Sequence, residues 1–279
     1  MMDRAGLKAI PGVYRLYQLY NYVLFQPRLA MAMLGDWSHG LRSTSVPLPP
    51  ARLRYRVHGA LDRKSFLRLG RVISANLHDL LGSVGRRLDS FETILDFGCG
   101  CGRVLRFLTS SAPASRFYAT DIDPSPIEWG QRNLPGIRWS ANAFSPPLQF
   151  DDDSFDLIYA ISVFTHLNES FQNAWLAELL RVARPGAILI LTVHGESLAG
   201  SLAASERATL DADGILFCKG ATGRLKLDGL PDFYQCTFHT RAYIDATWSK
   251  HFDIIGYVEG AIVGNQDAVL LRKRIGGIK

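Results

Sequence analysis

The chain has 279 residues, 47% of them apolar, which is enough for one large α/β domain with an appendage. A low-complexity or disordered chain is excluded. The four cysteines form no C-x-x-C pair and no zinc spacing, so we predict reduced thiols, no metal site and a cytoplasmic protein. The net charge of +5 is uneven, because residues 1–72 hold twelve Lys/Arg against three Asp/Glu.

The first 60 residues are predicted to form a helical arm and a linker. Apolar and aromatic side chains crowd between Pro11 and Pro27, where a helix spans about 22 Å, too short for a bilayer core of ~30 Å. The arm packs on the body, on a second subunit or over the substrate. Peripheral membrane contact through residues 7–34 is the alternative, supported by the aromatic content and by Arg15 and Arg28.

The basic segment suits an anionic membrane, a phosphate-bearing substrate or nucleic acid, or it is simply a solvated surface. After a linker at 43–50, arginines at 52, 54 and 56 alternate with apolar residues, which predicts a short extended piece. A helix follows from Asp62 to about Leu81, with one apolar face.

Strands and helices then alternate, which predicts right-handed crossovers and a mostly parallel sheet. The predicted strands are 93–97, 116–121, 137–141, 155–161 and 187–193, and the helices are 103–112, 125–134 and 169–183. Residues 195–240 interrupt this rhythm as an insertion on the substrate side, with turns at Asp213-Gly214 and 221–223. A helix at 241–250 and strands at 253–258 and 268–272 complete a domain spanning 61–279.

A glycine loop follows the first of these strands. The pattern is D-x-G-x-G-x-G, with Asp96 on the strand and Gly98, Gly100 and Gly102 in the loop. A dinucleotide fingerprint would require glycine at position 103, which is Arg103. A carboxylate at the strand end repels a pyrophosphate and suits an amino-bearing ligand.

The loop resembles motif I of the class I S-adenosylmethionine (SAM)-dependent methyltransferases. Two further stretches carry the resemblance, namely D-I-D-P at 121–124 and S-V-F-T-H-L at 162–167. The resemblance implies a Rossmann-like, seven-stranded, mostly parallel sheet whose final strand inserts antiparallel. The implied SAM-binding residues are Asp96, Phe97, Gly98, Cys99, Gly100, Gly102, Arg103, Asp121, Ile122, Asp123, Asn142, Ala143, Phe144, Ile161, Ser162 and His166.

Individual roles follow from this resemblance. Asp121 or Asp123 binds the ribose, with Asp123 favoured, although one of them can instead cap the helix that begins at Pro124. Ile122 packs on the adenine. The family usually has Asp where this chain has Asn142, which can still accept a hydrogen bond through its carbonyl oxygen. Arg56 or Arg71 would suit the contact to the methionine carboxylate. The alternative is that both are ordinary surface arginines.

The predicted activity is methyl transfer to a small molecule, at an oxygen of a glycan, a lipid-linked intermediate or a secondary metabolite. A hydroxyl acceptor needs a general base, for which His194, His166 and His239 are the candidates, with His194 slightly favoured. Nucleic acid is disfavoured, because no RNA-binding module is recognisable. A SAM-binding partner subunit without transfer activity is a further alternative, and the oligomeric state is open.

Overall fold

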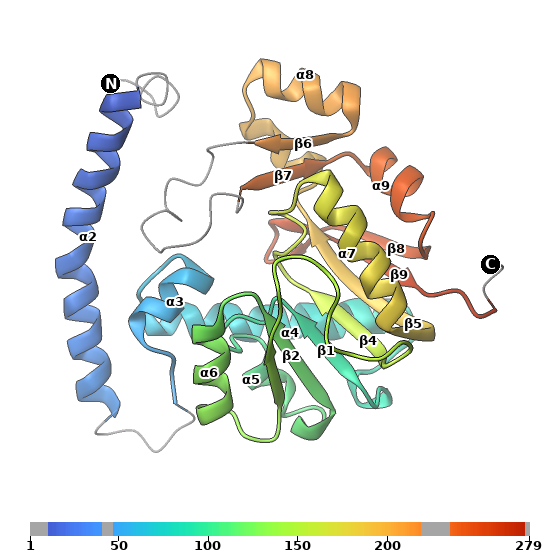
Figure 1. Ribbon diagram of the computed structural model, residues 1–279, viewed down its shortest axis with the longest axis horizontal. Coiled ribbons are helices and arrows are strands. Elements are labelled where there is room, and N and C mark those ends of the chain that lie inside the picture. Colours follow the sequence, from blue (N-terminus) through green and yellow to red (C-terminus); the bar gives the residue numbers. More distant parts are fainter. Residues whose placement is uncertain (1–10, 41–46, 219–234, 277–279) are drawn as a thin grey trace.

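The computed structural model describes residues 11–40, 47–218 and 235–276. A seven-stranded sheet in the order β3-β2-β1-β4-β5-β9-β8 forms its centre (Figure 1). Only β9 runs antiparallel to its neighbours, as predicted. The strands are β1 Ile94–Phe97, β2 Phe117–Asp121, β3 Arg138–Ala141, β4 Phe155–Ala160, β5 Ala183–Val193, β8 Asp253–Ile262 and β9 Gln266–Arg272.

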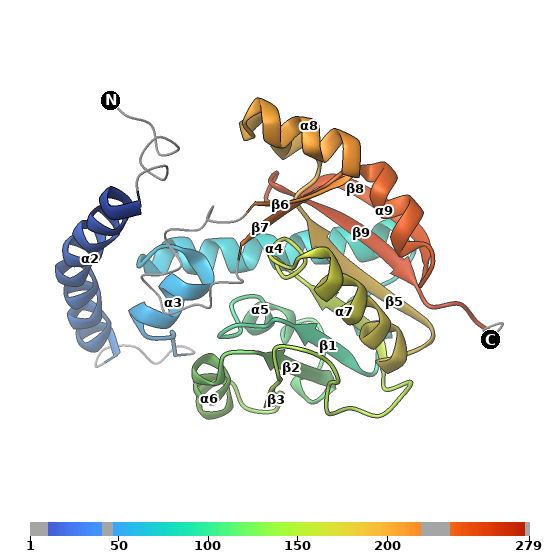
Figure 2. The same cartoon turned by 45° about the horizontal axis from the view of Figure 1, so that its top comes forward.

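Helices cover both faces of this sheet, as the turned view in Figure 2 shows. The α-helices are α2 Pro11–Gly40, α3 Ala51–His58, α4 Arg63–Ser83, α5 Leu105–Leu108, α6 Pro124–Asn133, α7 Glu169–Val182, α8 Ala204–Asp213 and α9 Arg241–Trp248. Short 3₁₀ turns lie at Leu88–Ser90, Ala114–Arg116 and Glu196–Ser201. The predicted alternating α/β architecture is therefore confirmed.

The strand alternation divides the core into two layers. In β1, Ile94 faces the layer that contains α4, α5 and α6, whereas Leu95 faces the layer that contains α7 and α9. Both side chains are fully buried, because successive residues of a strand point to opposite faces of a covered sheet. This packing fixes the carboxyl ends of β1, β2 and β4 side by side at one edge.

Two predictions for the N-terminal segment are wrong. Helix α2 does not end at Pro27 but continues through it to Gly40. Residues 51–58 are the helix α3 rather than an extended piece. The α3 geometry gathers Leu53, Arg56 and Val57 on one face, at the i, i+3 and i+4 spacing of a helix, while Arg54 is buried on another face.

Two helices differ from their predicted lengths for local reasons. Asp62 caps α4 by accepting from the Ser65 amide, so this helix begins one residue later than Asp62. Helix α5 covers only 105–108 of the predicted 103–112, because turns occupy both flanks. Strand β5 begins at Ala183, four residues before the predicted start at 187, and includes Pro185 and Gly186.

The insertion after β5 folds in part as a small separate sheet. Strands β6 Ile215–Cys218 and β7 Cys236–His239 pair antiparallel, and α8 precedes them. Gly214 adopts a left-handed conformation at the end of α8, which confirms the predicted turn at Asp213-Gly214. The predicted turn at 221–223 lies outside the described residues. Within the described ranges, no helix combines the length and the hydropathy of a membrane span.

Candidate cofactor-binding site

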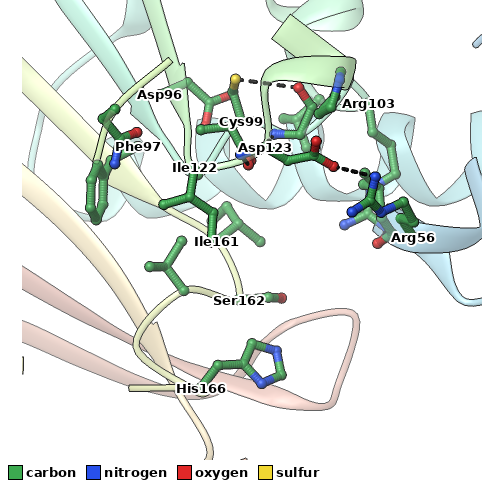
Figure 3. Close-up of a pocket in the computed structure, with 18 of the residues that line it drawn as sticks. Arg56, Asp96, Phe97, Cys99, Arg103, Ile122, Asp123, Ile161, Ser162 and His166 are labelled. Carbon is green, nitrogen blue, oxygen red and sulfur yellow. Dashed lines mark hydrogen bonds and ion pairs between the residues drawn. The ribbon is translucent and has the colours of Figure 1, made fainter. Parts of the chain in front are cut away.

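A pocket opens where β1, β2 and β4 end, the edge of a parallel sheet where ligands bind. Fourteen of the sixteen predicted SAM-binding residues line it, whereas Gly102 and Ala143 lie outside its lining. Figure 3 labels ten of its side chains, with Asp96 of β1 and Asp123, which follows β2, opposite Ser162 and His166. The lining residues that were not among those sixteen are Leu53, Arg56, Val57, Val104, Pro126, Val163, Leu167 and Trp175.

The loop after β1 requires glycine. Gly98, Gly100 and Gly102 all have positive φ, and a Cβ on Gly98 would lie 2.3 Å from Val163 Cγ2. The amides of Gly98 and Cys99 both donate to the Thr120 carbonyl, which fastens the loop to β2. Gly102 has a different role, because a Cβ there would lie 2.7 Å from Leu134 on the side away from the pocket.

Asp96 is buried at the base of the pocket and accepts a 2.9 Å hydrogen bond from the Tyr159 hydroxyl. Burial raises the pKa of Asp96 to about 8, because a carboxylate loses its hydration there. The side chain is therefore protonated below that pH when no cation is near. A cationic amino group in the pocket would stabilise the ionised form.

The two acids after β2 hold different partners. Asp121 accepts from the amides of Gly100 at 2.8 Å and Asp123 at 2.9 Å, and burial raises its pKa to about 6. Asp123 caps α6 through the Ser125 amide and forms a 2.6 Å ion pair with Arg56 (Figure 3). The predicted helix cap is therefore Asp123, and both acids also face the pocket.

Apolar and amide groups surround the remaining space near β2 and β3. Ile122 and Ile161 both line the pocket and lie near each other in Figure 3. Phe144 packs on Phe171 with ring centroids 4.3 Å apart. Among the described residues, no donor reaches the buried Oδ1 of Asn142, while its Nδ2 donates to the Ala143 carbonyl. The pocket thus holds an unsatisfied acceptor beside a flat apolar slot.

Of the three predicted histidines, only His166 lines the pocket. Its Nδ1 donates to the Gln235 carbonyl at 2.5 Å. His194 packs behind it, with ring centroids 6.4 Å apart, and burial lowers its pKa. His239 is fully buried, contacts Gln172 Oε1 at 3.0 Å, and has its pKa lowered to about 3 by burial.

Helix α3 supplies a wall of the pocket that the sequence did not predict as such. Leu53, Arg56 and Val57 line the pocket, and the Val57 carbonyl accepts from Arg103 at 3.3 Å. Of the two arginines proposed for the methionine carboxylate, Arg56 lies in the lining and Arg71 stacks over the Phe107 ring outside it. The double proline Pro49-Pro50 was the available signal for a helix start at Ala51.

Part of this chain is similar to known methyltransferases. A family model described as a methyltransferase domain matches residues 94–186, from β1 into β5. A phthiotriol/phenolphthiotriol dimycocerosates methyltransferase of Mycobacterium ulcerans is 31% identical over 105 residues, which are 37% of this chain and 38% of that protein. A malonyl-[acyl-carrier protein] O-methyltransferase of Hahella chejuensis is 32% identical over 144 residues, 47% of this chain and 50% of the relative.

The chain therefore spans half or less of the length of these two relatives. Among solved structures, the 1,6-didemethyltoxoflavin-N1-methyltransferase of Burkholderia thailandensis, solved with S-adenosylhomocysteine, has a TM-score of 0.52 at 17% identity. That match covers 83% of this chain and 93% of the solved one, and it shows the shared fold.

A glycine loop after β1, acids after β2 and a seven-stranded sheet with one antiparallel strand define a Rossmann-like protein that binds a nucleoside-containing ligand. Within that class, residues 94–186 match the methyltransferase-domain family, which agrees with the class I SAM-dependent methyltransferase family predicted from motif I. The predicted cofactor, S-adenosylmethionine, agrees with these methyltransferase matches.

Proposed function

We propose that this protein transfers the sulfonium methyl group of SAM to an oxygen atom of a small, lipid-type acceptor. The observation that carries the proposal is the convergence of Asp96, the glycine loop and the two acids after β2 on one pocket. The names of the two relatives, a dimycocerosates methyltransferase and a malonyl-[acyl-carrier protein] O-methyltransferase, support the acceptor class.

The residues present fit the cofactor. The glycine loop is a cradle that side chains would fill, since a Cβ on Gly100 would lie 2.7 Å from Val57. The unsatisfied Oδ1 of Asn142 suits the adenine amino group, and Ile122 suits the adenine face. Asp121 and Asp123 would hold the ribose hydroxyls, and Arg56 beside them would meet the methionine carboxylate or shield Asp123 until ribose binds.

Alignment is the main contribution of the protein to the chemistry. When bound, SAM supplies the electrophilic methyl group for an in-line displacement by the acceptor. Pocket walls that hold donor and acceptor in line can provide about 7–11 kcal/mol. The apolar lining of Phe97, Phe144 and Trp175 would exclude water from that reaction.

His166 is the residue we propose as the general base for a hydroxyl acceptor. A carbonyl can only accept, so the bond to Gln235 places a proton on Nδ1. In the neutral ring Nε2 then carries the lone pair that takes a proton. His194 and His239 are less suitable, because neither lines the pocket and burial lowers the pKa of both. A carboxyl acceptor would need no base.

Binding of S-adenosylhomocysteine, measured by calorimetry, tests the cofactor site. We expect Asp123→Asn and Asn142→Ala each to weaken binding by about tenfold or more, because each removes a hydrogen bond to a polar ligand group. The exposed Asp89→Asn variant is the matched control and should bind like the wild type. Equal affinity in all four proteins would refute the assignment.

Incubation with methyl-labelled SAM and cell extract tests the acceptor. Label in a lipid-extractable small molecule supports the proposal. His166→Ala should then lower the rate by ~10²–10⁴-fold with the affinity for S-adenosylhomocysteine kept, whereas His251→Ala serves as the control. Label in RNA would favour a nucleic-acid methyltransferase, and no label would favour a binding subunit.

The structure gives the nucleic-acid alternative little support. Its basis was the basic N-terminal segment, but Arg54, Arg56 and Arg63 of that segment pair with carboxylates of the same chain. Those charges are therefore neutralised locally and contribute less to an external phosphate backbone.

A further inference from the structure

Helix α2 exposes an almost continuous apolar face. The exposed fractions are 68% for Leu16, 74% for Met31, 67% for Leu34 and 69% for Trp37. Folded proteins normally bury such side chains, and scattered exceptions need no explanation, but these lie on one helix and on one side of it.

The spacing shows that this is one stripe. Positions three and four apart fall on the same side of a helix, and here they alternate over more than three turns. The members of this stripe, which we call the outer face, are Val13, Leu16, Tyr20, Val23, Pro27, Ala30, Leu34 and Trp37, with Leu19, Leu24, Met31 and Met33 along its borders. The outer face contains no charged residue.

The opposite side of α2 is fastened to α3. The Phe25 and Tyr55 rings are 4.4 Å apart, and Asp36 forms a 2.9 Å ion pair with Arg54, which is fully buried. In both Figure 1 and Figure 2, α3 lies between α2 and the sheet, and α2 forms the rim of the molecule. The outer face therefore cannot turn inward without breaking these contacts.

The size of the outer face matches that of apolar patches that often have a function. From residue 13 to residue 37 a helix rises about 36 Å, and its width is about 10 Å. The projected area is thus roughly 360 Å², within the range in which the largest patch of a monomer usually serves an interaction.

The charge of the segment around the outer face indicates what binds there. Between residues 4 and 35 the sequence has no acidic residue but contains Arg4, Lys8, Arg15 and Arg28. Aromatic residues and flanking cations around an apolar helix face are the features of a helix that lies in an anionic lipid surface. A second copy of this helix fits less well, because residues 4–35 contain no acid that could pair with these cations across an interface.

We propose that the outer face of α2 docks on the surface of an anionic lipid bilayer, with the helix lying in the interfacial plane. Because α3 joins α2 to the pocket, this orientation brings the Leu53, Arg56 and Val57 wall of the pocket close to the membrane. The docking proposal does not rest on the proposed methyl transfer, since it follows from α2 alone.

Flotation of the full chain with vesicles tests the proposal. The probes are vesicles of phosphatidylcholine with and without phosphatidylglycerol. The wild type should float with the anionic vesicles. The partition coefficient of Leu16→Glu/Leu34→Glu for these vesicles should be lower by about tenfold or more, because two apolar anchors become charged. The control Val72→Glu/Ile275→Glu changes two apolar residues exposed elsewhere and should float like the wild type.

Two measurements keep the outcome decisive. Calorimetric binding of S-adenosylhomocysteine by the Glu variants should equal that of the wild type, which shows that the fold is intact. Arg28→Gln should reduce the preference for anionic vesicles. Equal flotation of wild type and Leu16→Glu/Leu34→Glu, or no flotation of either, would overturn the proposal. A lipid-free wild-type dimer that becomes monomeric in this variant would assign the face to a second copy and also overturn it.

Discussion

Asp96 makes the stability of the ligand-free protein fall as pH rises. Its folded-state pKa of about 8 lies well above the ordinary value of 3.8, so between these values the folded state holds a proton that the unfolded state has lost. Stability must then decrease with pH by at most about 1.4 kcal/mol per unit. From pH 6 to pH 8 this one group should remove about 2 kcal/mol.

Replacing Asp96 by Asn should abolish this dependence, because the amide carbonyl can still accept from Tyr159 but has no proton to lose. Urea unfolding of both proteins at pH 6, 7 and 8 without ligand measures the slope. Asp121→Asn is the internal control. Because the pKa of Asp121 is about 6, its contribution to the pH dependence of stability falls mainly below pH 6, and the slope between pH 7 and pH 8 should remain in this variant. A wild-type slope that persists in Asp96→Asn would refute the reasoning.

Two further substitutions test the scaffold of the site. Gly98→Ala should lower the free energy of unfolding by about 3 kcal/mol, because position 98 has a positive φ and the added Cβ overlaps Val163. In urea unfolding, adding Val163→Ala should restore only the part that is due to the overlap. Unchanged stability of Gly98→Ala would contradict this. Asp36→Asn should cost about 2 kcal/mol by weakening the bonds to buried Arg54. Amide hydrogen exchange should then rise in α3, and unaltered exchange there would contradict the role of the pair.

Local signals predicted the sheet and the nucleoside side of the pocket. The strand, the glycine loop and the following helix form one short segment. The sequence alone therefore predicted that Asp96 and Gly98 line the same site. Asp121 was placed beside them because parallel strands end at one edge, and the Gly100 amide does bond its carboxylate. Regular βα units need little information beyond their own periodicity.

Tertiary contacts decided the elements that the sequence did not predict. Residues 52–57 alternate as a strand would, yet they form α3, in which Arg54 and Arg56 both reach partners distant in sequence. Arg54 reaches Asp36, Pro49 and Leu61, while Arg56, two residues later, reaches Asp123. A two-residue period was therefore outweighed by long-range ion pairs and hydrogen bonds that no local pattern reveals.

The histidines illustrate the same limit within the site. His166, His194 and His239 all follow or end strands near the carboxyl edge, so sequence position ranked them almost equally. What separates them is the β6–β7 sheet, which packs against β5 through the bridge between His194 and Phe238. That sheet encloses the two later histidines and leaves His166 in the pocket lining.

The ion pairs of α2 and α3 explain part of the uneven charge of the chain. Asp36 alone meets both Arg54 and Arg63, and Asp123 meets Arg56, so part of the basic excess of the N-terminal segment fastens α2 and α3 to the domain. Residues 4–35 contain four cations and no acidic residue. The same segment thus combines an inner side held by ion pairs with an uncharged apolar outer face and unbalanced cations elsewhere on the segment, a combination that an anionic lipid surface complements.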